Sequence, residues 1–127
     1  MASLKEWESH IGNFISQHLK TDIGKGPEYI RATITGSCIL IYCRNIMTTL
    51  ESKLLQDPVK GKDLVIETRR VYRRVTEPER IKELESWIGL RIVDSFRDWN
   101  LENNSSMYVL MFERELPEWL EQRSPSA

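Results

Sequence analysis

Residues 29–43 read YIRATITGSCILIYC, and this stretch decides the fold. Residues 29–35 alternate between apolar and polar side chains, which predicts a β-strand with one buried face. The Gly36-Ser37 pair is a short turn signal, and residues 38–43 are apolar on both faces, as in a central strand covered on both sides. The stretch therefore predicts an antiparallel β-hairpin.

A second hairpin is predicted towards the C-terminal end. Leu90, Ile92 and Phe96 alternate with mostly polar residues and are expected to share one face of a strand. Residues 103–105 read Asn-Asn-Ser, which is a turn composition, and residues 107–112 are again apolar on both faces. Two such hairpins make a four-stranded antiparallel sheet.

Helices are predicted before and between the hairpins. Residues 3–6 form a capping box that opens a helix with an apolar stripe, and this helix ends before Gly24. A second capping box at residues 48–51 opens a short helix, in which Leu50 and Leu54 are expected to point inward.

The stretch from residue 59 to residue 88 predicts one kinked helix or two helices in line, because Pro78 interrupts it. The first inward stripe of this helix is expected to comprise Leu64, Thr68, Val71 and Val75. A last short amphipathic helix is expected to carry Leu116, Trp119 and Leu120 on one face.

The predicted fold class is α+β: a two-layer arrangement of a four-stranded antiparallel sheet from two β-hairpins, with helices packed on one face. The element order is α-β-β-α-α-β-β-α. We expect one domain over residues 1–122 and a frayed tail at residues 123–127. The second apolar face of the two central strands needs a cover, which either the Trp119 segment or a second copy would supply. We expect a homodimer. The expected interface residues are Trp119, Leu120, Tyr108 and Phe112.

Composition indicates which classes of partner and which cellular compartment to expect. The formal net charge is −1, and nucleic-acid-binding domains carry a basic excess, so no nucleic-acid partner is expected. Residues 38–43, the longest apolar run, are too short to span a bilayer, and residues 1–6 lead into no apolar signal segment. We therefore expect a cytoplasmic protein without direct membrane insertion. Cys38 and Cys43 are expected on opposite faces of one strand, as reduced thiols.

Basic residues concentrate on the long helix, at Lys60, Lys62, Arg69, Arg70, Arg73 and Arg74. Like charges four residues apart destabilise a helix by roughly a few tenths of a kcal/mol per pair, and only Asp63 and Glu67 offset them nearby. Either this is a solvated face balanced by acidic residues elsewhere, or forked guanidinium groups bind an anion or an acidic partner. The expected anion- or partner-binding residues are Lys25, Arg69, Arg70 and Arg73.

No catalytic, metal or cofactor site is expected. His10 and His18 lie eight residues apart, which is not the spacing of a helical metal-binding pair. Ser95 and Asp98 have no histidine nearby in the sequence, so hydrogen bonding at a strand end is the favoured interpretation. Residues 24–27 read Gly-Lys-Gly-Pro, lack the spacing of a P-loop, and are expected to connect a helix to a strand.

Several stretches together resemble the bacterial MpsC-like domain family. They are residues 24–27, the pair Gly61-Lys62 with residues 68–70, and the pair Ile88-Gly89 followed by residues 92–98. The resemblance covers residues 14–112. It implies an accessory role in a Na+-translocating, membrane-potential-generating system, with related systems tied to bicarbonate or cation uptake, and it implies no catalytic residues.

The leading interpretation is a non-enzymatic cytoplasmic interaction or regulatory module. It would be a homodimer that binds a membrane-protein partner or a small anionic ligand, as an accessory to a membrane cation or bicarbonate transport system. A sensor domain for a small anion or a nucleotide, with a pocket between sheet and helices, is the alternative. An uncharacterised enzyme assembled from distant residues is a second alternative, and its candidate residues are Asp94, Ser95, Asp98 and Arg97.

Overall fold

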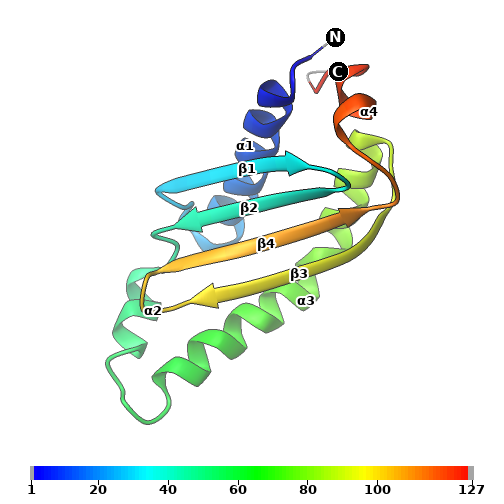
Figure 1. Cartoon of the computed structure of the whole chain (residues 1–127). Helices are drawn as coiled ribbons and strands as arrows, with labels where there is room; N and C mark the ends of the chain where they lie inside the picture. Colours follow the sequence, from blue (N-terminus) through cyan, green and yellow to red (C-terminus); the bar gives the residue numbers. More distant parts are fainter. Residues whose placement is uncertain (1, 126–127) are drawn as a thin grey trace.

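The computed structural model describes residues 2–125. The elements in chain order are α1 (Leu4–Ile23), β1 (Tyr29–Thr35), β2 (Cys38–Arg44), α2 (Thr49–Leu54), α3 (Gly61–Ile88), β3 (Ile92–Asn100), β4 (Ser105–Phe112) and α4 (Pro117–Glu121). The long helices α1 and α3 cross one face of a single sheet and leave the opposite face open (Figure 1). The predicted α+β class, element order and layering are confirmed.

The sheet has the strand order β1-β2-β4-β3, and every neighbouring pair is antiparallel. The two hairpins therefore join through their second strands, β2 and β4, which lie at the centre as their apolar character on both faces predicts. Cys38 and Cys43 are free thiols, and they lie on opposite faces of β2, as their spacing predicts.

Helix α1 packs on the β1–β2 half of the sheet through a mainly apolar layer, and at the sheet edge its Glu8 carboxylate accepts a hydrogen bond from the Ile34 N–H (2.8 Å). Ser3 caps the helix by accepting a hydrogen bond from the Glu6 backbone N–H, and Gly24 ends it in the left-handed conformation (φ 89°) that favours glycine. The fully buried residues of α1 lie opposite buried strand residues of β1 and β2. These buried residues are Trp7, Ile11, Ile15 and Leu19 on α1, and Ala32, Ile34, Ile39 and Ile41 on the strands.

Helix α4 closes the end of the core between α1 and α3, and does not cover the open sheet face (Figure 1). The Trp7 indole donates to the Leu120 carbonyl (2.8 Å), and the Trp119 indole donates to the Ile88 carbonyl (2.9 Å). Three of the four expected interface residues, Leu120, Tyr108 and Phe112, are buried in the core of their own chain, and Trp119 is half-buried. These side chains therefore pack the monomer.

The structure also places part of the segment that was expected to fray. The Trp7 indole donates to the Arg123 carbonyl (3.3 Å), and the Trp87 indole donates to the Pro125 carbonyl (2.9 Å). Pro125 is buried. Residues 123–125 are thus tied to α1 and α3 and not frayed, whereas residues 126–127 lie outside the described part of the chain.

Helix α3 is a single helix from Gly61 to Ile88 that contains Pro78, and the prediction of its inward face is wrong for its first half. Leu64, Val71 and Val75 are 46%, 38% and 72% exposed. The buried residues are instead Gly61, Val65, Arg69, Arg80, Leu84 and Ile88. Arginine can occupy an inward face because its long stem is apolar and its guanidinium finds acceptors inside.

The prediction for helix α2 is also wrong, because a charged residue faces inward there and not the expected leucines. Leu50 is 68% exposed, Leu54 is half-buried, and the buried residue of the helix is Glu51. Its carboxylate completes the predicted capping box with Thr48 and at the same time pairs with Arg69 of α3. A salt bridge with a distant element therefore sets the rotation of this short helix.

A β-bulge near the start of β3 reverses the facing of its later residues. Ile92 lies opposite Phe112, but Asp94 lies opposite Met111, so Val93 is an extra residue in the register. Ile92 therefore faces the helices while Phe96 faces away and is 55% exposed, in contrast to the expectation that both share a face. Beyond the bulge, Ser95, Arg97 and Trp99 are the residues that face α3.

Candidate functional site

The helix-facing side of the sheet changes from apolar to charged between β1 and β3. One row across the four strands reads Ala32, Ile41, Tyr108 and Arg97. Opposite its polar end, the middle of α3 contributes Arg69, Arg73 and Arg80. The four residues Arg69, Arg73, Arg80 and Arg97 are called the arginine layer below.

Arg69 is neutralised inside the arginine layer. Its guanidinium donates two hydrogen bonds of 2.6 Å to the Glu51 carboxylate and a third of 2.8 Å to the Ile46 carbonyl. Lys25 donates to the next carbonyl, that of Met47 (3.0 Å). Both cations therefore fix the connection between β2 and α2. Burial pushes the pKa of Glu51 up, but the hydrogen bonds from Arg69 and Thr48 outweigh it and lower the pKa below 4.5.

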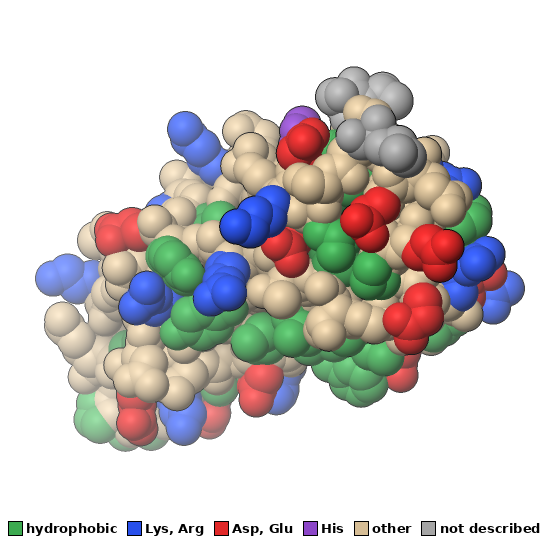
Figure 2. All heavy atoms as spheres, turned by 45° about the horizontal axis from the view of Figure 1, so that its top comes forward, with side chains coloured by type: hydrophobic (Ala, Val, Ile, Leu, Met, Phe, Trp, Pro, Cys, Tyr) green, Lys and Arg blue, Asp and Glu red, His purple; other side chains and the backbone are tan. Residues whose placement is uncertain are grey.

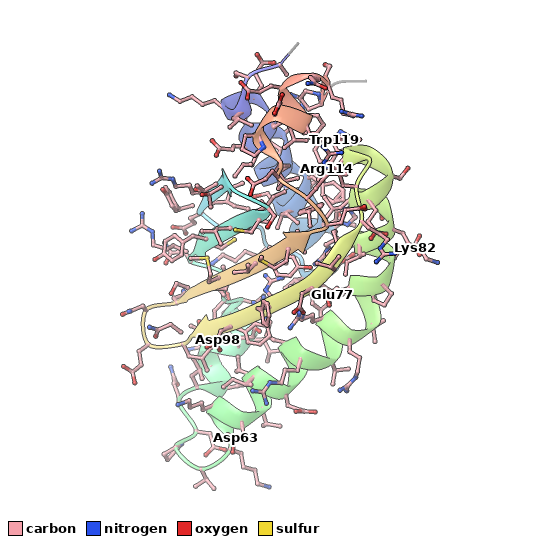
Figure 3. The ribbon with its side chains drawn as sticks, turned by 45° about the vertical axis from the view of Figure 1, so that its right-hand side comes forward. Asp63, Glu77, Lys82, Asp98, Arg114 and Trp119 are labelled. Atoms are coloured by element: carbon pink, nitrogen blue, oxygen red, sulfur yellow. The ribbon has the colours of Figure 1, made fainter. Side chains whose placement is uncertain are left out.

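Arg73 belongs to a second hydrogen-bonded group. Its guanidinium donates to Glu77 (2.9 Å) and to the Ser95 hydroxyl (3.0 Å), and the Tyr108 hydroxyl also donates to Glu77 (2.8 Å). Burial opposes ionisation of Glu77, but the bonds from Arg73 and Tyr108 lower its pKa below 4.5. Burial and the Glu77 carboxylate together raise the pKa of Tyr108. Figure 3 shows Glu77 between α3 and the strands β3 and β4.

Arg80 is almost fully buried (2% exposed) and only weakly paired. It donates to the Tyr72 hydroxyl (2.8 Å), and its nearest carboxylate is that of Asp22, at 3.8 Å. Its Nε has no hydrogen-bond partner. Three carboxylates thus share the arginine layer with four guanidinium groups.

Arg97 carries the charge that no carboxylate balances. Its Nε is buried without a hydrogen-bond partner, and within residues 2–125 it forms no ion pair. Its guanidinium lies over the rings of Tyr108 (4.9 Å) and Trp99 (5.9 Å). Burial lowers the pKa of Arg97, and the positive charge of Arg80 adds to this effect, yet arginine stays protonated at neutral pH.

Two further unpaired donors lie beside Arg97 on the same face. Trp99, two residues along β3, has a buried indole N–H without an acceptor. Ser106, opposite Trp99 in the β3–β4 register, has a buried hydroxyl that lies beside the Cys43 thiol, which is a weak hydrogen-bonding group. Buried donors are normally paired, so this group lacks a strong acceptor. A small oxyanion would supply both the acceptor oxygens and the missing negative charge.

The arginine layer is reachable from outside at strand β3. A depression of about 450 Å³ is lined by Arg73, Ser95, Phe96, Arg97, Asp98, Met107 and Val109. Both cations in its lining, Arg73 and Arg97, belong to the arginine layer, and its single carboxylate, that of Asp98, is exposed on β3 (Figure 3). A wider groove of about 860 Å³ between α1 and α3 has Phe14 and Trp87 in its wall, but no unpaired buried polar group lines it.

The four residues that sequence analysis assigned to anion binding do not meet in one place. Lys25 and Arg69 lie together at the β2–α2 connection, Arg73 lies at β3, and Arg70 is exposed beside Lys60 on another side of α3. Sequence reasoning did not single out Arg80, and it named Arg97 only in the enzyme alternative and not among the anion-binding residues. The spacing of Arg69, Arg73 and Arg80, at i, i+4 and i+11, was an available signal for one helical face.

Two features that would indicate a class of protein are absent from the described residues. Among residues 2–125, no helix combines the length and the apolar character that crossing a bilayer requires. In the same range, no group of three or more His, Cys, Asp or Glu side chains is arranged to hold a metal ion.

Comparison with known proteins gives a family. Residues 3–114 match the family model described as "Na+-translocating membrane potential-generating system (MpsC)". No curated protein and no solved structure shows significant similarity. The match covers most of the chain and agrees with the resemblance carried by the Gly-Lys-Gly-Pro and Arg-Arg segments. The chain therefore belongs to the MpsC family.

Proposed function

We propose that this protein is a non-enzymatic regulatory module of the cytoplasm that responds to a small oxyanion. The oxyanion binds at Arg97 and Arg73 in the arginine layer, and the module assists a membrane system that moves cations or bicarbonate. The family description supports the link to a membrane-potential system. The unbalanced charge of Arg97 is the observation that carries the anion-binding part.

The chemistry of the arginine layer favours an oxyanion over other ligands. A guanidinium presents a planar fork of N–H donors that matches carboxylate, bicarbonate or phosphate oxygens, and it binds them more strongly when water is excluded. Arg97 and Arg73 both line the depression, and the Nε–H of Arg97 is buried without a hydrogen-bond acceptor. Hydrogen bonds to charged groups contribute about 1.5–3 kcal/mol each, so one bound oxyanion offsets a large part of the burial of Arg97.

Ligand binding at this site also has a route to the rest of the fold. Arg73 connects α3 to β3 through Ser95, and Glu77 connects α3 to β4 through Tyr108. An anion that attracts Arg73 competes with Glu77 for the same guanidinium. Occupancy would therefore change how α3 is held against the sheet, and α3 has an exposed face available to a partner.

Thermal unfolding at constant ionic strength tests the anion-binding part. Bicarbonate, phosphate, acetate and ATP are each compared with chloride, using the wild type, Arg97→Met and the matched control Arg70→Met. A ligand at 100 times its Kd stabilises by about 2.7 kcal/mol, which raises the Tm by roughly 10 °C for a domain of this size. We expect this rise for the wild type and the control and not for Arg97→Met. Equal Tm values in all anions would contradict the proposal.

Affinity purification from native membranes in mild detergent tests the accessory role. We expect the tagged protein to retain an integral membrane transport protein. Its Lys60→Glu/Arg70→Glu variant, altered at two exposed basic residues of α3, reports whether that helix takes part in the contact. Recovery of the tagged protein with no membrane protein would count against the accessory role. It would not bear on the anion site, which the thermal unfolding experiment tests separately.

A further inference from the structure

The open sheet face is apolar along its centre. We use this name for the side of the sheet that no helix covers, formed by the outward side chains of β1, β2, β4 and β3. Its central row reads Thr33, Leu40, Val109 and Phe96. Phe96 is 55% and Met107 is 40% exposed. A band of hydrophobic side chains crosses the lower half of Figure 2, where this face lies.

The two edges of the open sheet face carry opposite charges. The outward residues of β1 include Arg31, and the outward residues of β3 include Asp94 and Asp98. Arg31 lies in the same cross-strand row as Asp98, because Arg31 pairs with Tyr42, Tyr42 with Met107, and Met107 with Asp98. Arg31 is exposed and forms no ion pair within the described chain.

We propose that a second copy of this chain covers the open sheet face, with the twofold axis parallel to the strands between β2 and β4. This rotation places β1 of one copy over β3 of the other. Each cross-strand row of one copy then lies over the same row of the other copy. Arg31 then faces Asp98 of the second copy, and Leu40 faces Val109. The contact is self-complementary, as a twofold interface must be.

The other in-plane twofold axis, perpendicular to the strands, gives a poorer match. It places β3 over β3, so that Asp94 and Asp98 of one copy meet the same acidic strand of the other. Like charges across an interface are unfavourable and suppress wrong arrangements. The charge pattern therefore selects the parallel axis, and aligned sheets at about 10 Å separation are a common packing of apolar sheet faces.

Charge reversal at the two edges tests the interface. We expect the wild type to have twice the 14.9 kDa chain mass in light scattering after gel filtration. Arg31→Asp and Asp98→Arg should each raise the dimer Kd by roughly tenfold or more, and the double variant should return the Kd to near the wild-type value. Restoration by the double variant would be hard to explain by misfolding.

Two control substitutions locate the contact. Asp63→Arg reverses an exposed charge at the far end of α3 (Figure 3) and should leave the dimer unchanged. Val75→Lys alters the exposed apolar stripe of α3 and should also leave it unchanged. A wild type that stays monomeric would overturn the proposal. So would a dimer that Val75→Lys dissociates and Asp98→Arg does not.

Cys38 supplies an independent distance test. It lies on the open sheet face, whereas Cys43 is buried on the other side of β2. The proposed axis separates the two Cys38 Cα atoms by about 11 Å, from the usual spacings of packed sheets and adjacent strands. A short bis-maleimide should therefore link two chains through Cys38, and Cys38→Ser should abolish the link.

Arg73 and Arg97 face the helices, but the depression that leads to them also has Phe96, Asp98, Met107 and Val109 of the open sheet face in its wall. Separate variants therefore distinguish the two proposals: Arg97→Met should lose the response to oxyanions and keep the dimer, whereas Arg31→Asp should weaken the dimer and keep that response.

Discussion

Helices α1 and α3 cover the same sheet by opposite means. Helix α1 buries Trp7, Ile11 and Ile15 in an apolar core, and the Glu8 carboxylate meets the sheet at its β1 edge, where it accepts a hydrogen bond from the Ile34 N–H (2.8 Å). The middle of α3 places the arginine layer against Tyr108 and the later residues of β3. The first interface is an ordinary hydrophobic core. The second is held by hydrogen bonds and ion pairs that leave one guanidinium unbalanced.

The difference separates stability from function within one small domain. Burying apolar area stabilises by about 25 cal/mol per Å², without requiring directional partners. A buried ion pair gives little net stability over an apolar pair of the same shape, because desolvation offsets attraction. The arginine layer therefore adds little to the net stability of the fold. Buried groups with perturbed pKa values cluster at functional sites, and this layer is where the chain has them.

The largest loss of stability is expected from a substitution in helix α1. Trp7→Ala removes a fully buried indole that also donates to the Leu120 and Arg123 carbonyls. We expect a loss of about 3–5 kcal/mol in the free energy of unfolding, measured by urea denaturation. An equal loss from Arg97→Ala would remove the contrast between the two sides.

A smaller loss is expected when an ion pair of the arginine layer is broken. Glu51→Gln leaves Arg69 buried without its countercharge, which should lower the free energy of unfolding by about 3 kcal/mol. The exposed Glu67→Gln is the matched control and should change it by less than about 0.5 kcal/mol. The double variant Glu51→Gln/Arg69→Met should recover much of the loss, since it removes both charges. A double variant as unstable as the single one would show that packing, not charge, dominates there.

Acid sensitivity should come from the α3 side. The pKa values of Glu51 and Glu77 are lowered by folding, so their contribution is present above about pH 4.5 and is lost as the pH falls through the folded-state values. Tm measured from pH 3 to pH 7 should fall on the acid side of this range. The Glu77→Gln variant should be less stable than the wild type at pH 7, and its Tm should fall less steeply than that of the wild type as the pH is lowered. A variant with the wild-type slope would contradict this assignment.

Local signals in the sequence predicted most of the fold. The hairpin at residues 29–43, the Ser3 and Thr48 caps and the helix end at Gly24 are each decided by neighbouring residues, and the structure contains all of them. The apolar character of β4 on both faces placed it correctly at the centre of the sheet. Periodicity and capping therefore define the elements and their order.

The facing of α3 and of β3 could not be predicted, because distant residues decide it. Arg69 faces inward because Glu51, 18 residues earlier in the chain, meets it there, whereas the apolar residues Leu64 and Val71 remain exposed. The bulge at Val93 has no signature in the local sequence, yet it turns Arg97 inward. The candidate site depends on both events, so its central residue was missing from the predicted set.

The most direct test of the account is the free energy of unfolding of Arg97→Met in a chloride buffer without added oxyanion. If Arg97 is a half-buried, unpaired charge kept for ligand binding, methionine of similar length should raise the free energy of unfolding by roughly 1 kcal/mol or more. The same variant should lose the stabilisation by oxyanions. An Arg97→Met protein that is less stable than the wild type in chloride, yet still responds to oxyanions, would contradict the account.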